Sequence, residues 1–136
     1  MDRDGACPRV LVRPHHMDVL SDIQRCLSFA RAETGGLGLA FDPVGLLAPS
    51  MIGKAEDHLR RFADAIRGCP AIGAIMLSDG DLDENGSIEA TPTHGGEIEV
   101  GLLREFATIA AAGGIPLILW GKLEEQQPDL ILSWIG

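Results

Sequence analysis

Residues 37–47 read Leu-Gly-Leu-Ala-Phe-Asp-Pro-Val-Gly-Leu-Leu, a short apolar run that stops at the carboxylate of Asp42. Continuous apolarity over 37–41 is typical of a parallel strand that is covered on both faces. A proline and a glycine follow Asp42 closely and end the strand. We therefore expect a buried strand that presents one charged side chain at the carboxyl end of a parallel sheet, where α/β folds place their sites.

The rest of the chain repeats this arrangement. Apolar, β-rich runs predict further strands over 9–13, 72–77 and 115–120. Helical periodicity lies between and after them, in helices predicted near 20–34, over 55–66, over 99–113 and over 128–135. The spacing of Ser21 and Gln24 matches a capping box at the first of these helices. Strands alternating with helices predict an α/β fold of four βα units around a parallel sheet.

Residues 80–96 interrupt this regularity as a polar segment without a period. A loop of that length in a small domain is usually functional or mobile, so we expect one of the two here.

Length and composition predict one globular domain over residues 1–136, with 1–8 as a loose lead-in. Hydrophobic residues make up 46% of the 136-residue chain, which is in the globular range. The net charge is −9, which repels phosphate backbones and makes nucleic acid and anionic membranes poor partners. Three cysteines without paired spacing indicate reduced thiols. The first residues are acidic and lack the apolar stretch of a signal peptide, so we expect a cytoplasmic protein.

Carboxylates and histidines follow the predicted strands at the sheet edge where a site is expected. Asp42 and Asp79 each come directly after an apolar strand, and together could hold a divalent metal or serve in acid–base chemistry. The alternative is that each caps its following loop through backbone N–H groups. His15 and His16 could supply one metal ligand, because adjacent side chains on an extended chain point apart, or could simply be solvated. His94 could contact a substrate.

Three stretches resemble the xylose-isomerase-like TIM barrels, the superfamily of sugar phosphate isomerases and epimerases and of apurinic-type endonucleases. Residues 36–45 are similar to the family strand that ends in Asp-x-Gly-His, and residues 74–79 to its Val-His-Leu-x-Asp strand. Residues 94–100, followed by Leu102 and Leu103, resemble its Gly-Glu-Gly-x-Ile-Asp segment. Residues 11–15 and 115–121 fall on two further strands. The resemblance covers nearly the whole chain and implies the C-terminal half of a TIM-type barrel.

The resemblance also implies a divalent metal (Mn, Zn or Mg) held by Glu, Asp, His and Glu at successive strand ends. Of these ligands the chain keeps Asp42, while the other positions read Arg13, Met76 and Trp120 or Gly121. Gly45 stands where the family has a His after its Asp. Because a cation replaces a carboxylate, we expect Arg13 to pair with Asp42 across neighbouring strand ends and to do electrostatically what the metal did.

The function implied by the resemblance is a sugar phosphate isomerase/epimerase-like protein with a degenerate metal site, acting on or binding a small sugar- or polyol-type ligand. The alternative is a non-catalytic half-barrel that serves as a ligand-binding or protein-interaction module. A DNA-repair role is disfavoured by the negative charge. The candidate catalytic residues are Asp42, Asp79, His94 and Glu97. The candidate substrate-binding residues are Arg13, His15, His16, Trp120 and Lys122. Open strand edges predict a homo-oligomer or a complementary half-barrel as partner.

Overall fold

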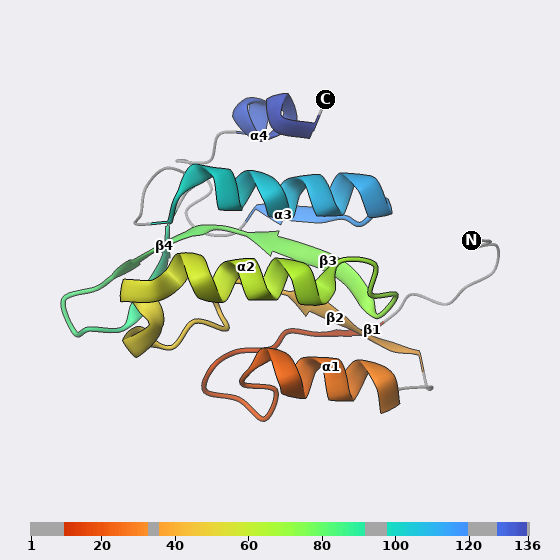
Figure 1. Cartoon of the computed structure of the whole chain (residues 1–136), viewed down its shortest axis with the longest axis horizontal. Helices are drawn as coiled ribbons and strands as arrows, with labels where there is room; N and C mark the ends of the chain where they lie inside the picture. Colours follow the sequence, from red (N-terminus) through yellow and green to blue (C-terminus); the bar gives the residue numbers. More distant parts are fainter. Residues whose placement is uncertain (1–9, 33–35, 92–97, 120–127, 136) are drawn as a thin grey trace.

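The computed structural model describes residues 10–32, 36–91, 98–119 and 128–135 (Figure 1). Its main sheet has four parallel strands, β1 (Val10–Val12), β2 (Leu37–Phe41), β3 (Ile72–Leu77) and β6 (Leu117–Leu119), in the order β1-β2-β3-β6. Neighbouring strands in this sheet are therefore also consecutive along the chain, if the hairpin strands between β3 and β6 are left aside. This confirms the predicted α/β class and the parallel sheet.

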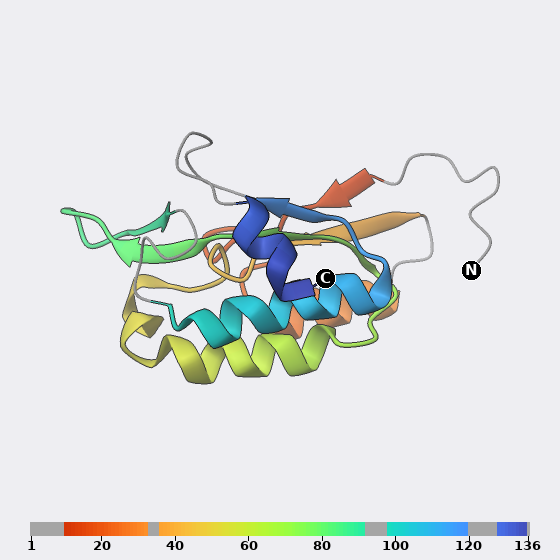
Figure 2. The same ribbon diagram turned by 90° about the horizontal axis from the view of Figure 1, so that it is seen from above.

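Three helices form one layer against the sheet: α1 (Ile23–Ala32), α2 (Ala55–Ile66) and α3 (Val100–Gly113) (Figure 2). A fourth helix, α4 (Pro128–Ile135), packs beside α3. A 3-10 turn, η1 (Pro49–Lys54), leads into α2. A sequential parallel sheet with α1, α2 and α3 on the same face is the arrangement of half a TIM-type barrel.

Strand residues alternate between the two faces of the sheet. Phe41, Ile75 and Leu77 belong to the main core with the apolar sides of the helices, and each is at most 1% exposed. Ala40, Ala74 and Met76 alternate with these residues along β2 and β3 and form a second, smaller cluster on the other face of the sheet. The continuous apolarity read in the sequence thus corresponds to strands buried on both faces.

The helix ends follow local chemistry. Gly114 ends α3 in the left-handed conformation, at φ 62°, where a residue without Cβ is favoured. Helix α1 differs from the expectation of a Ser21–Gln24 capping box. Its first turn is capped by Asp22, whose Oδ1 accepts a hydrogen bond from the N–H of Arg25 at 2.9 Å. An Asp is an equally good cap, and its side chain reaches the third N–H of the helix.

The polar segment after β3 is wrongly predicted as an irregular loop. It contains an antiparallel hairpin of β4 (Asp79–Leu82) and β5 (Ile88–Thr91). The connecting turn has Gly86 at φ 77°, and its N–H donates to the carbonyl of Asp83 at 3.1 Å. The pair Asn85–Gly86 is a strong turn signal, but the short flanking strands carry too many acidic residues to read as strands. In Figure 1 the hairpin extends beyond the sheet at the carboxyl end of β3.

No helix in the described ranges is long and apolar enough to cross a membrane.

Candidate functional site

The carboxyl ends of β1 and β2 enclose a pocket of about 130 Å³. Its walls come from the segment after β1, from the turn after β2 and from strand β5 of the hairpin. The lining residues are Arg13, His15, His16, Asp42, Val44, Gly45 and Ile88. Four of these seven, Arg13, His15, His16 and Asp42, are candidates from the sequence. The structure therefore brings these four together where the strand order places the site.

An ion pair between Arg13 and Asp42 forms part of the wall of this pocket. Nη2 of Arg13 donates to Oδ2 of Asp42 at 2.6 Å, and Nε donates to the same oxygen at 3.0 Å. The Asp42 side chain is 1% exposed and that of Arg13 is 38% exposed. The expected pairing across neighbouring strand ends is thus confirmed. Burial of the carboxylate makes the charge-assisted hydrogen bonds from the guanidinium necessary.

The turn after β2 supplies the remaining partner of Asp42. The N–H of Gly45 donates to Oδ1 of Asp42 at 3.0 Å, as expected if this Asp caps its loop. The carbonyl of Gly45 in turn accepts from the N–H of His16 at 2.9 Å, which ties the turn to the segment after β1. A Cβ on residue 45 would lie 2.7 Å from Oδ2 of Asp42. Glycine is therefore the residue that lets the carboxylate and the backbone approach each other.

The two histidines lie side by side, contrary to the expectation that they point apart. Their ring centroids are 4.4 Å apart with an interplanar angle of 34°. The reason is that the backbone turns here, with the N–H of Asp18 donating to the carbonyl of His15, so the alternation of an extended chain does not apply. Burial and then the neighbouring His15 lower the pKa of His16, while Asp18 acts in the opposite direction.

Asp79 is buried at 1% exposure and binds backbone. Its Oδ1 accepts from the N–H of Gly80 at 2.7 Å and from the N–H of Ile98 at 2.9 Å, which fastens the end of β3 to the entry of α3. Within the part of the chain that the structure describes, the second, buried oxygen, Oδ2, has no hydrogen-bond partner, and the same holds for the buried Oγ of Ser78. Asp81 uses its Oδ1 for the N–H of Leu82. The loop-capping alternative therefore describes the contacts of Asp79.

The described donors do not fit a divalent metal. Both oxygens of Asp42 already accept hydrogen bonds, and a guanidinium occupies the position next to the carboxylate. Within the described ranges no three His, Cys, Asp or Glu side chains gather where they could hold an ion. Hard divalent cations need several oxygen ligands, so a lone carboxylate paired with an arginine is a poor site for them.

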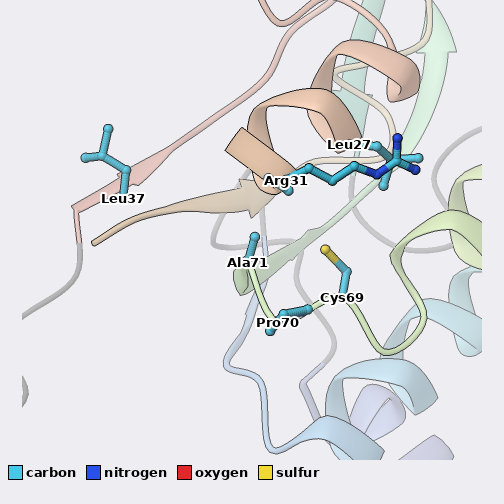
Figure 3. A pocket seen from close by; sticks show the side chains of 7 residues that line it. Leu27, Arg31, Leu37, Cys69, Pro70 and Ala71 are labelled. Atoms are coloured by element: carbon cyan, nitrogen blue, oxygen red, sulfur yellow. The ribbon is translucent and has the colours of Figure 1, made fainter. Parts of the chain in front are cut away.

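A larger pocket of about 330 Å³ lies at the opposite end of the sheet (Figure 3). Its lining residues, mostly apolar, are Leu27, Ala30, Arg31, Leu37, Cys69, Pro70 and Ala71. Leu37 begins β2 and Ala71 precedes β3, so this pocket is at the amino ends of the strands. Among the described residues, Cys69 and the core residue Cys26 are free thiols, and burial raises the pKa of Cys26 to about 11.

Four sequence candidates lie outside the described residues: His94, Glu97, Trp120 and Lys122. Three wall residues, Val44, Gly45 and Ile88, were not among the sequence candidates. Val44 follows Asp42 closely enough to have been suspected. Ile88 depends on the hairpin, which brings an apolar residue from far along the chain to the end of β1.

A comparison with models of known protein families finds no match for the chain, and a search of curated proteins finds none.

Proposed function

We propose that this chain is a metal-free relative of the xylose-isomerase-like barrels that binds a small sugar- or polyol-type ligand at the carboxyl ends of β1 and β2. In this proposal it is a ligand-binding module of half-barrel form. The observation that carries the proposal is the ion pair of Arg13 with the buried Asp42, at the edge of a pocket where the resemblance implies a metal. The guanidinium supplies the positive charge that the ion would supply.

The contacts of the carboxylates disfavour a metal-dependent isomerase. Proton transfer next to a carbonyl needs a base in reach of the substrate and an electrophile that stabilises the developing charge. Asp42 is committed to Arg13 and Gly45, and Asp79 is committed to backbone N–H groups. The pocket has a guanidinium and two imidazoles, and its carboxylate is already hydrogen-bonded to the protein. This favours ligand binding over proton transfer.

The open edges of the main sheet favour a partner as well. Among the described residues, Val10 on β1 is 64% exposed and Ile118 on β6 is 43% exposed, and these strands are the two outer members of the sheet. A closed TIM-type barrel has about eight strands, twice the number in this sheet. A second copy of the chain, pairing β1 with β6, is the partner that we propose.

The experiment uses the full chain labelled with ¹⁵N and titrated in turn with glycerol, glycerate and sulfate. The proposal expects glycerol or glycerate to shift the amide resonances of His16 and Gly45 in a saturable manner, and sulfate alone would not support it. The variant Arg13→Gln should abolish the shifts. A matched control is Arg25→Gln, an exposed arginine on α1 that pairs with Asp22 and does not line the pocket.

A manganese titration tests the metal-free part of the proposal. Mn²⁺ broadens resonances near its binding site, so a stoichiometric site at Asp42 would remove the signals of Arg13, Asp42 and Gly45 selectively. We expect no such selective loss. Selective broadening at micromolar Mn²⁺, or the absence of any probe-dependent shift at the pocket, would contradict the proposed function.

A further inference from the structure

The polar groups that line the strand-end pocket are mainly hydrogen-bond donors. Arg13 brings a guanidinium, which has donors and no acceptor. Nδ1 of His15 accepts a hydrogen bond from the N–H of Met17 at 3.2 Å. This bond assigns the proton of the neutral ring to Nε2, so His15 is a donor through its other nitrogen. His16 adds a second imidazole beside it.

The carboxylate in the pocket wall is unavailable to a ligand. Asp42 is 1% exposed, its Oδ2 accepts from Arg13 twice, and its Oδ1 accepts from Gly45. The other side chains of the wall, those of Val44 and Ile88, are apolar. A ligand that complements this wall brings acceptors, because a donating hydroxyl group would find no exposed carboxylate among the described lining residues to accept its hydrogen bond.

The charges in the pocket limit how much negative charge the ligand carries. Arg13 and Asp42 form an ion pair of opposite charges, and among the described residues the charged groups that act on His16 are His15 and Asp18. The rings of His15 and His16 are 4.4 Å apart, and the neighbouring His15 is one of the causes that lower the pKa of His16. One imidazolium can therefore be formed on binding, and it balances one negative charge.

Resting on the proposed function and deepening it, we infer that the strand-end pocket binds the carboxylate of a small hydroxy acid, a sugar acid in preference to a neutral sugar or a dianion. The carboxylate accepts from the donors of Arg13, His15 and His16, and the apolar contacts with Val44 and Ile88 accommodate the carbon chain. The cavity of about 130 Å³ corresponds to roughly four water molecules at liquid density, which suits a carboxylate and a short hydroxylated chain.

Binding of a monoanion beside these rings is coupled to proton uptake. Burial and the neighbouring His15 lower the pKa of His16 in the unliganded protein, and a bound carboxylate opposes both by stabilising the imidazolium. Affinity for the anion consequently increases as the pH falls from about 8 to about 6. A neutral polyol lacks this dependence.

The test is isothermal titration calorimetry of the full chain with glycerate, glycerol and sulfate at about pH 6 and about pH 8. We expect glycerate to bind about tenfold or more tightly than glycerol at the lower pH, as for a charge-assisted hydrogen bond, and to weaken at the higher pH. The variant His16→Gln keeps hydrogen-bonding capacity but cannot take up a proton, so it should bind glycerate with a reduced pH dependence. His58→Gln, on α2 and away from the pocket, is the matched control.

The outcomes separate this inference from the proposed function. Glycerol binding as tightly as glycerate would overturn the carboxylate assignment and leave the proposed ligand-binding function in place. Sulfate binding as tightly as glycerate would overturn the restriction to a single charge. No heat and no pocket shifts with any of the three probes would overturn both. An unchanged pH dependence in His16→Gln, with His58→Gln as wild type, would refute the coupling to this histidine.

Discussion

At the scale of single residues, the carboxylate of Asp42 and the backbone of Gly45 are in mutual contact, and this contact makes a sharp prediction. Gly45→Ala places a Cβ 2.7 Å from Oδ2 of Asp42. The carboxylate must shift away from Arg13 or the turn must open, and we expect a loss of about 1–3 kcal/mol in the free energy of unfolding. Urea denaturation followed by circular dichroism measures it.

Gly53→Ala is the control for that substitution. A Cβ at residue 53 would meet no atom within 4 Å, so this variant should be as stable as the parent or slightly more stable. Equal stabilities of the two alanine variants would show that the contact between residues 45 and 42 does not constrain the site.

The ion pair could be predicted from sequence because it depends on only two facts. Arg13 and Asp42 follow neighbouring parallel strands, and their charges are opposite. The contact between the rings of His15 and His16 could not be predicted, because it depends on a backbone turn that no residue in this segment strongly indicates. Ile88 was missed for a related reason, since its place in the wall requires the hairpin first.

At the scale of elements, Asp79 connects β3 to the start of α3, and its substitutions distinguish anchoring from ligand contact. Asp79→Ala removes the acceptor of the N–H groups of Gly80 and Ile98, and we expect a loss of about 2 kcal/mol. Asp79→Asn retains an oxygen at the same position and should lose less than about 1 kcal/mol. Both variants should bind the ligand of the strand-end pocket as the parent does.

Asp81→Ala is the matched control, because this residue lies on the same hairpin and, among the described residues, its side chain accepts from the adjacent N–H of Leu82 alone. Its stability should be within about 0.5 kcal/mol of the parent. An Asp79→Ala variant as stable as Asp81→Ala would rule out the anchoring role. Loss of ligand binding in a fully stable Asp79→Asn variant would instead place this carboxylate in the site.

The main strands and helices could be predicted because their signals are strong and local. Helix α2 buries Leu59, Phe62 and Ala63 at helical spacing, and β2 and β3 are uninterrupted apolar runs. The hairpin of β4 and β5 could not be predicted, because Asp81 and Glu89 face each other on strands that carry little apolar surface. Such strands form where the preceding element directs them, and their own residues signal them weakly.

At the scale of the whole molecule, the proposed second copy makes a measurable prediction. Sedimentation velocity of the chain at micromolar concentration should give a species of twice the 14.5 kDa mass of one chain. Ile118→Lys puts a charge on the outer strand β6, which is a common device against edge pairing, and it should shift the equilibrium toward the monomer. Leu132→Lys, at an exposed position on α4, is the control and should leave the dimer intact.

A chain that sediments as a monomer at all accessible concentrations would rule out the second copy as partner. It would not affect the strand-end pocket, because every described residue that lines this pocket belongs to one chain.

The hydrogen bond from the N–H of Ile98 to Asp79 affects how freely the hairpin can change in length. This bond joins two residues that are 19 positions apart in the sequence. The hairpin lies between them, so the two ends of the inserted segment are fixed next to each other. Loop-closure entropy grows slowly with length, so lengthening or shortening the hairpin changes the stability of the sheet little. Because Ile88 is part of the pocket wall, the hairpin is the element through which the binding preference can diverge while the scaffold stays the same.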